Sequence, residues 1–207
     1  MNATSVPACV DLVDDDDAFR AALCDLLRAC GVPVRAYASA AAYLAELPGG
    51  PGCLLLDVHM PHQSGLDLQA ELARRGLHKP ILFVTGAGDI PMTVRALRAG
   101  AEDFLTKPVD RQVLLAAIER AFARDAQQRA GALAHEALRQ RFARLTPREA
   151  EVCRALVTGS LNKQVAYALG TTERTIKAHR HQIMSKLEVR SMAELSTLYE
   201  RLQRGPG

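Results

Sequence analysis

Short apolar runs alternate with longer amphipathic stretches through the first part of the chain. A mainly apolar run is typical of a strand whose two faces are both buried, as in a parallel sheet. The pattern therefore predicts five buried strands, at residues 9–13, 33–37, 53–57, 81–85 and 103–106.

A helical stripe of apolar residues follows each predicted strand. In the clearest one, at residues 18–30, the apolar positions are spaced three and four apart, and Gly31 is a stop signal. Ser39 is suited to cap a second helix, and Pro91 suits the first turn of a fourth. Residues 113–122 carry the fifth stripe. Five β–α units in series predict an α/β domain with a doubly wound, five-stranded parallel sheet.

The remainder of the chain has helical signals only. Residues 125–142 are rich in Ala, Gln and Arg, and we interpret them as a helical linker that continues the fifth helix. Beyond it, Thr146 and Glu149 form a capping box around Pro147, and Thr172 is suited to cap a longer helix after a turn at Gly170. A short helix, a Gly-containing turn and a longer polar helix are typical of a helix-turn-helix. We expect a first domain at 1–124, the linker at 125–142 and a small all-α, four-helix domain at 143–207, with helices near 147–158, 162–169, 173–187 and 192–203.

Composition and charge narrow the function classes. The 207 residues are 48% hydrophobic and 24% charged, which excludes a disordered tail or a disulfide-stapled miniprotein. Five Cys without a CxxC pair, no signal peptide and no apolar run that could span a bilayer predict a soluble, cytoplasmic protein with no membrane partner. Residues 1–124 carry 15 acids and 12 bases, net −3, whereas residues 125–207 carry 8 acids and 14 bases, net +6. The excess of basic residues in 125–207 favours an anionic partner such as nucleic acid. A solvated basic surface without a partner would have the same excess.

Reactive side chains stand at the carboxyl ends of four predicted strands. Four consecutive aspartates begin at Asp14, and Asp57, Thr85 and Lys107 end or follow the later strands. In an open parallel sheet these ends meet at one edge, where ligands bind. Gathered carboxylates favour Mg²⁺, an Asp can accept a phosphoryl group, and a Lys and a Thr can bind its oxygens. The cluster predicts a phosphoryl-transfer site, with helix capping as the alternative for Asp16 and Asp17 and a metal-dependent phosphohydrolase as the alternative activity.

The polar face of the longer helix is suited to DNA. At 100° per residue, Ile183 and Leu187 fall near Ile176 and are expected in the core. The opposite side suits the major groove, and residues near the helix start can reach phosphates. The groove-facing set is Arg174, Ala178, His181 and Ser185, flanked by Lys177 and Gln182, and the phosphate-contacting set is Lys163, Thr172 and Thr175.

Residues of the first domain resemble the receiver domain of two-component response regulators over about residues 8–124. The resemblance rests on Val13-Asp14-Asp15, the ten residues from Leu56 to Gly65, Val84-Thr85-Gly86 and Lys107-Pro108, and residues 85–92 are similar to the FixJ-like subgroup. It implies a flavodoxin-like fold in which Asp57 is the phosphoacceptor and Lys107 pairs with the phosphoryl group. It also implies Mg²⁺ ligands at Asp14, Asp15, Asp57 and the backbone carbonyl of His59, and switch residues at Thr85 and Phe104. The His59 side chain is expected to modulate the site, and His62-Gln63 departs from the commoner acidic-apolar pair.

The last part resembles the LuxR-type helix-turn-helix over about residues 143–204. The matching residues are 145–149, Asn162-Lys163, 172–180 and 184–187. The resemblance places Lys177, Ala178 and His181 at base-facing positions. It implies a FixJ/NarL-type regulator that a histidine kinase phosphorylates with Mg²⁺ and that dimerises on double-stranded promoter DNA, most often as an activator working with RNA polymerase. A phosphate sink or scaffold with a vestigial DNA domain is the alternative, and it predicts phosphorylation without sequence-specific binding.

Overall fold

The computed structural model describes residues 6–86 and 90–205. The chain divides into two compact units, Met1–Gln127 and Gln128–Gly207. Residues 87–89, part of the stretch that is similar to the FixJ-like subgroup, lie outside the described residues.

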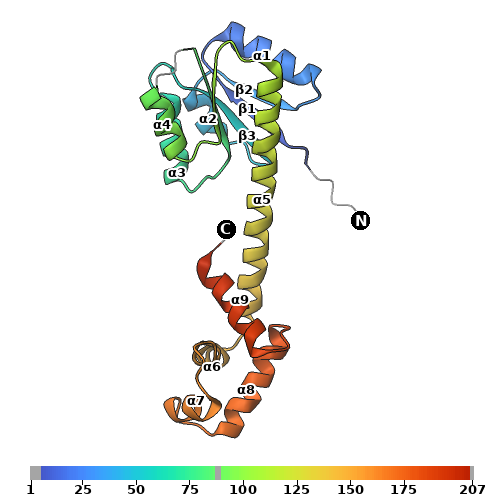
Figure 1. The fold of residues 1–207 in the computed structure, drawn as a ribbon, viewed down its shortest axis with the longest axis vertical. Coiled ribbons are helices and arrows are strands. Elements are labelled where there is room, and N and C mark those ends of the chain that lie inside the picture. The colour runs from blue at the N-terminus through green and yellow to red at the C-terminus, as the bar shows by residue number, and fades with distance from the viewer. Residues whose placement is uncertain (1–5, 87–89, 206–207) are drawn as a thin grey trace. The chain divides into compact units, whose positions relative to one another are not determined.

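The first unit is built on a five-stranded parallel sheet, as the sequence predicts. Its strands are β1 (Cys9–Val13), β2 (Val34–Tyr37), β3 (Gly52–Asp57), β4 (Ile81–Thr85) and β5 (Asp103–Thr106), in the order β2-β1-β3-β4-β5 (Figure 1). The second strand begins one residue later than predicted, after Pro33, which has no N–H to give to the ladder. Every crossover between parallel neighbours contains a helix, so the sheet is doubly wound.

Helices cover both faces of this sheet. The helices are α1 (Asp17–Ala29), α2 (Ala40–Glu46), α3 (Gly65–Arg74), α4 (Ile90–Arg98) and the first part of α5 (Arg111–Ala143). Alternate strand residues such as Leu55 and Leu82 pack with α1 and α5, whereas Leu54, Leu56 and Phe83 pack with α2, α3 and α4. These buried residues fix the strands, and with them the positions of the strand ends.

The helix α5 runs without interruption through the segment predicted as a linker. Asp125, which the sequence places at the start of that linker, is buried in the first unit, where its Oδ2 accepts a hydrogen bond from the Gly52 N–H at 2.9 Å. The two compact units divide after Gln127, two residues further on.

The second unit contains the four predicted helices of the C-terminal part. They are α6 (Pro147–Val157), α7 (Asn162–Ala168), α8 (Glu173–Lys186) and α9 (Met192–Arg204). The capping box forms as predicted, with Thr146 Oγ1 accepting from the Glu149 N–H and Glu149 accepting from the Thr146 N–H. Ile176, Ile183 and Leu187 are fully buried in the core that these helices share. Among the described residues, no helix is both long and apolar enough to cross a membrane.

Candidate functional site

Three carboxylates meet at one edge of the sheet in the first unit. Asp57 is the last residue of β3, and Asp14 and Asp15 follow β1, the strand beside it. Oxygen atoms from all three carboxylates lie within 4.8 Å of one another. Asp14 and Asp57 are buried and Asp15 is exposed, so the cluster has one side open to solvent.

Lys107 brings an ammonium group to this cluster from the end of β5. Its Nζ lies 2.7 Å from Asp14 Oδ2 and 3.6 Å from Asp57 Oδ1. The same Nζ is 3.9 Å from the centroid of the Phe19 ring, a cation–π distance. The backbone N–H of Lys107 donates to the Thr85 carbonyl at 2.7 Å, which fixes where the side chain starts. The ammonium is thus held by Asp14 and is within reach of Asp57.

The electrostatics of the cluster favour a bound cation. Burial raises the pKa of Asp57, and the negative charges of Asp14 and Asp15 raise it further, against the opposing effect of Lys107. A divalent ion among the carboxylates would offset both the burial and the mutual repulsion. The donor set consists of oxygen atoms, which is the chemistry that Mg²⁺ prefers. The residues present therefore fit the predicted Mg²⁺ site.

Asp16 has a structural part in the same loop. Its Oδ1 accepts from the N–H groups of Ala18 and Phe19 at 2.9 and 3.0 Å, and it is the N-cap of α1. These hydrogen bonds lower the pKa of Asp16. Asp17 forms an ion pair with Arg20. The capping interpretation holds for Asp16, whereas Asp17 lies in the first turn of the helix.

Thr85 contacts His59 across the site. The Thr85 side chain is fully buried at the end of β4, and its Oγ1 lies 3.2 Å from Nδ1 of the exposed His59 imidazole. Sequence reasoning expected a modulating role for this imidazole without identifying its partner. The two residues are 26 apart in sequence, and only the folded sheet brings them together.

Phe104, the predicted aromatic switch residue, is half-buried in β5. Its ring centroid lies 6.1 Å from that of Phe83, with the ring planes tilted by 40°. The ring packs against the cluster formed with α2, α3 and α4, on the face that includes Ala96. It is therefore placed between the sheet edge and the surface near α4.

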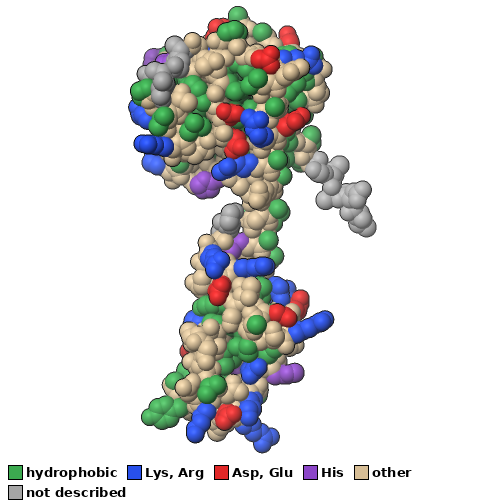
Figure 2. All heavy atoms as spheres, in the orientation of Figure 1, with side chains coloured by type: hydrophobic (Ala, Val, Ile, Leu, Met, Phe, Trp, Pro, Cys, Tyr) green, Lys and Arg blue, Asp and Glu red, His purple; other side chains and the backbone are tan. Residues whose placement is uncertain are grey.

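In the second unit, the polar face of α8 is open to solvent as predicted. Figure 2 shows basic side chains at the end of this unit formed by α7 and α8. The exposed residues on α8 and around it are Lys163, Thr172, Arg174, Lys177, Ala178, His181, Gln182 and Ser185, and Thr175 is half-buried. Thr172 caps the helix by accepting from the Thr175 N–H at 3.2 Å. One feature was missed from the sequence: Lys177 Nζ pairs with Glu173 Oε1 at 3.0 Å, four residues earlier on the helix.

Comparisons with known proteins agree with both units. A family model of the response regulator receiver domain matches residues 10–119, and one of the luxR family of bacterial regulatory proteins matches residues 143–199. Nodulation protein W of Bradyrhizobium diazoefficiens is 45% identical over 199 residues, which cover 96% of this chain and 88% of that protein. The transcriptional regulatory protein FixJ of Azorhizobium caulinodans is 42% identical over 187 residues, which cover 90% and 89% of the two chains.

Solved structures of response regulators are also similar to this chain. The structure of the response regulator StyR has 44% sequence identity and a TM-score of 0.81, covering 95% of this chain and 100% of that one. Full-length FixJ from B. japonicum has 35% identity and a TM-score of 0.58, covering 95% and 98%. This chain therefore belongs to the two-component response regulators that join a receiver domain to a LuxR-type DNA-binding domain.

Proposed function

We propose that this protein is a transcriptional activator that is switched on when Asp57 is phosphorylated by a partner histidine kinase. The observation that carries the proposal is the placement of Asp57: a buried carboxylate beside two further carboxylates and within 3.6 Å of Lys107. The second unit of the same chain presents an exposed, basic helix face. A protein that binds promoter DNA in this way would act in the cytoplasm.

The receiver would accept the phosphoryl group at an Asp57 carboxylate oxygen. This oxygen attacks the phosphorus of the kinase's phosphohistidine, and the P–O bond forms as the P–N bond breaks and the imidazole leaves. Lys107 would exchange part of its contact with Asp14 for the new phosphoryl oxygens. Asp14, Asp15, Asp57 and the His59 carbonyl would hold Mg²⁺, which supplies charge neutralisation at the transferred group.

The phosphoryl group would change the surface near α4. It adds a charge of about −2 that the hydroxyl of Thr85 can approach. Thr85 would then leave His59, and the Phe104 ring would turn toward the space that the hydroxyl vacates. Val94 and Leu97 on α4 are large apolar side chains that are 38% and 45% exposed. They would contribute apolar surface to a dimer contact. We propose that this face, together with β5, joins two copies of the chain.

A dimer would place two α8 helices on neighbouring half-sites about one helical turn of DNA apart. Lys177, Ala178 and His181 would read base edges, and Lys163, Thr172, Arg174 and Thr175 would hold phosphates or flank the read bases. Residues 125–142 would serve as the helical connection between the functional domains, 1–124 and 143–207. RNA polymerase would then be the partner of the DNA-bound dimer.

Sedimentation with a phosphoryl mimic tests the proposal. The full chain is measured with Mg²⁺, with and without beryllofluoride, alongside Asp57→Ala. A change from monomer to dimer in the wild type alone is the expected result. An unchanged mass in the wild type would overturn phosphorylation-driven dimerisation, and a change that persists in Asp57→Ala would place the acceptor elsewhere.

A further inference from the structure

A cavity of about 580 Å³ lies between α9 and residues 131–141 of α5, within the second unit. Two contacts hold these helices beside each other (Figure 1). The Nε2 atom of His135 lies 3.2 Å from the Leu202 carbonyl oxygen. The rings of Phe142 and Tyr199 meet edge to face, with their centroids 5.9 Å apart. The volume between the two helices is typical of a site for a small molecule.

The apolar part of the lining is aliphatic. On α5, Gly131, Ala134 and Ala137 have no side-chain atom beyond Cβ, and this leaves space between helices that are in contact elsewhere. Leu138 of α5 and Leu198 of α9 add further aliphatic surface. Among the described residues that line the cavity, none has an aromatic carbocycle. The lining therefore fits a hydrocarbon chain better than a flat ring that needs a stacking partner.

The charged part of the lining is basic. Arg141, Arg201 and Arg204 line the cavity together with His135, and no acidic residue is among the described lining residues. Arg204 pairs with Glu200 at 3.4 Å. Arg141 and Arg201 form no ion pair within the described part of the chain. An anion in the cavity would therefore meet two guanidinium groups that no protein carboxylate neutralises.

Arg141 has an unused hydrogen-bond donor. Its Nη2 donates to the carbonyl of Leu187, the C-cap residue of α8, whereas its Nε is buried and has no partner among the residues that the structure describes. An adjoining cavity that shares Arg141 and Arg201 is lined by Glu188 and Glu194. Neither of these carboxylates pairs with the two arginines in the described ranges, and neither lines the cavity between α5 and α9.

The hydrogen-bonding groups of the lining favour a small aliphatic anion over a peptide segment. Both walls are helices, whose backbone groups are bonded mainly within the helix. Glycine, alanine, leucine and arginine side chains cannot accept a hydrogen bond, so the His135 imidazole is the single acceptor side chain in the described lining. A peptide would bury its N–H donors against this surface at a cost. A carboxylate only accepts hydrogen bonds, and an alkyl chain needs no polar partner.

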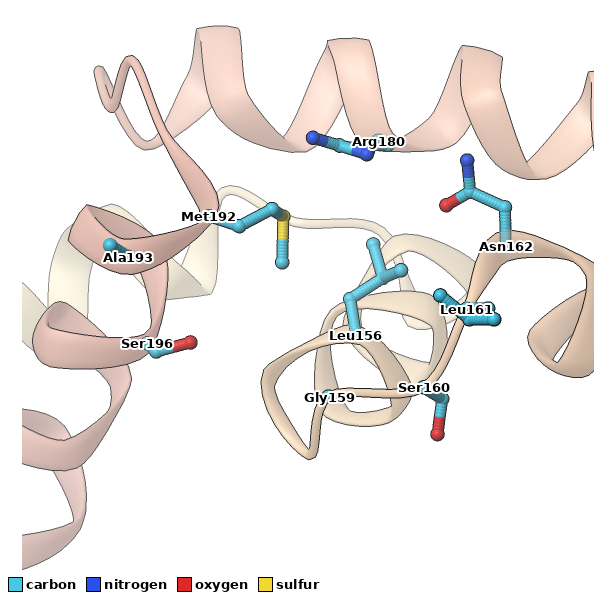
Figure 3. A pocket seen from close by; sticks show the side chains of 9 residues that line it. All are labelled: Leu156, Gly159, Ser160, Leu161, Asn162, Arg180, Met192, Ala193 and Ser196. Atoms are coloured by element: carbon cyan, nitrogen blue, oxygen red, sulfur yellow. The ribbon is translucent and has the colours of Figure 1, made fainter.

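Figure 3 shows a different cavity of the same unit, beside α8. It measures about 360 Å³, and Arg180 is the one cation that its described lining residues supply. Ser160, Asn162 and Ser196 also line it, and their side chains both donate and accept hydrogen bonds. This lining does not select one class of occupant, so Arg180 serves as a control position below.

We infer that the cavity between α5 and α9 binds an aliphatic carboxylate. Arg141 and Arg201 hold the carboxylate, and the small residues of α5 line the path of the alkyl chain. The site does not involve Asp57, so its occupation does not require phosphorylation. Arginines in the last turn of a helix also interact favourably with the helix dipole. That role alone requires no ligand, and it makes a different prediction.

Calorimetric titration of the full chain with octanoate tests the inference. Octanol has the same chain length without the charge, and acetate has the charge with a methyl group alone. Arg201→Gln removes an exposed guanidinium, and Ala134→Leu fills part of the cavity at an exposed position where both residues favour a helix. The matched controls are Arg180→Gln, at the cavity of Figure 3, and Ala132→Leu, at an exposed position of α5 that does not line the site.

We expect the wild type to bind octanoate, to bind octanol about tenfold more weakly and to give no binding heat with acetate. Arg201→Gln and Ala134→Leu should each weaken octanoate binding by about fivefold or more, with both controls within about twofold of wild type.

Absence of octanoate binding by the wild type would overturn the inference and leave the arginines their role at the helix ends. Equal affinities for octanol and octanoate, or equal octanoate affinities in all five proteins, would also overturn it. A loss in Arg180→Gln as large as that in Arg201→Gln would do the same, because it would show attraction to surface charge without a defined site.

Discussion

The Nδ1 atom of His59 lies 3.2 Å from Oγ1 of Thr85, the hydroxyl proposed to follow the phosphoryl group. A hydroxyl that moves toward a phosphorylated Asp57 has to leave this imidazole. The contact therefore stabilises the unphosphorylated arrangement, by an amount set by one hydrogen bond at a site that is partly open to solvent.

Replacing His59 should make activation easier. His59→Ala removes the partner that Thr85 would have to leave, a net contribution of about 1 kcal/mol or roughly fivefold in an equilibrium. We expect the beryllofluoride concentration for half-maximal dimerisation to fall by that factor, measured by sedimentation. His78→Ala is the control, because His78 is an exposed histidine away from the cluster. An unchanged midpoint in His59→Ala would show that the contact does not oppose the switch.

Asp57 should be the single acceptor of phosphate. Lys107 Nζ contacts the carboxylates of Asp14 and Asp57, and Asp57→Ala removes the second of these. We expect this variant to lose all labelling by radioactive acetyl phosphate. Asp25→Ala, which changes an exposed aspartate of α1, should label like the wild type. Retained labelling in Asp57→Ala would assign the acceptor role to another group.

Replacing Lys177 and replacing its partner Glu173 should change DNA affinity in opposite directions. Lys177→Ala should weaken specific binding by roughly 1–3 kcal/mol, because it removes a base contact. Glu173→Gln should strengthen binding several-fold, since it frees the Lys177 ammonium and removes a negative charge from the DNA-facing surface. Fluorescence anisotropy measures both, with a duplex selected from a random pool by the beryllofluoride-activated wild-type protein. Glu200→Gln on α9 is the control. Weaker binding by Glu173→Gln would contradict the placement of this face on DNA.

Gly65 should not tolerate a side chain. A Cβ atom at this position would lie 2.2 Å from the Asp57 carbonyl oxygen and 3.0 Å from Leu56 Cγ. The backbone at the end of β3 cannot yield easily, so we expect Gly65→Ala to lower the free energy of unfolding by about 3 kcal/mol. Urea unfolding measures the loss. Gly49→Ala, where a Cβ atom meets nothing within 4 Å, should unfold like the wild type, and equal stability of both variants would refute the clash.

The second unit should lose stability in acid through Glu149. The hydrogen bond from Lys186, together with that from the Thr146 N–H, lowers the pKa of the buried Glu149 carboxyl. The ionised form is thus favoured in the folded state, so its stabilisation is complete above the ordinary glutamate pKa of about 4.3. It is lost as the pH falls through the lowered folded-state pKa.

Glu149→Gln should therefore be less stable than the wild type by about 1–2 kcal/mol at neutral pH, and the difference should shrink in acid. Urea unfolding at pH 7 and at about pH 3.5 tests this. Glu151→Gln, which alters an exposed ion pair with Arg148, should change little at either pH. A difference between wild type and Glu149→Gln that is constant with pH would contradict the assignment.

The sequence predicted the fold well because its signals are local. Continuous apolar runs gave the five strands, and the capping residues Ser39, Thr146 and Thr172 placed three helix starts correctly. The cluster of Asp14, Asp15 and Asp57 could be foreseen because parallel strand ends share one edge. Contacts between side chains that are far apart in the sequence could not be predicted in this way. The pairing of Lys107 with Asp14 and the contact of His59 with Thr85 depend on rotamers and on neighbours far apart in sequence. The Lys177–Glu173 pair could have been predicted, because opposite charges four residues apart on a helix are known to form ion pairs.

Among the described residues, the apolar clusters of the two units have no member in common. The buried apolar residues of the first unit lie between Val10 and Ala121, whereas the cluster of the second unit is formed by residues between Val152 and Leu195. Substitutions that adapt the chain to a new signal and substitutions that adapt it to a new operator therefore fall on separately packed sets of side chains. Natural selection can change one specificity without repairing the interior that supports the other, and recombination between related genes can exchange either unit as an intact module.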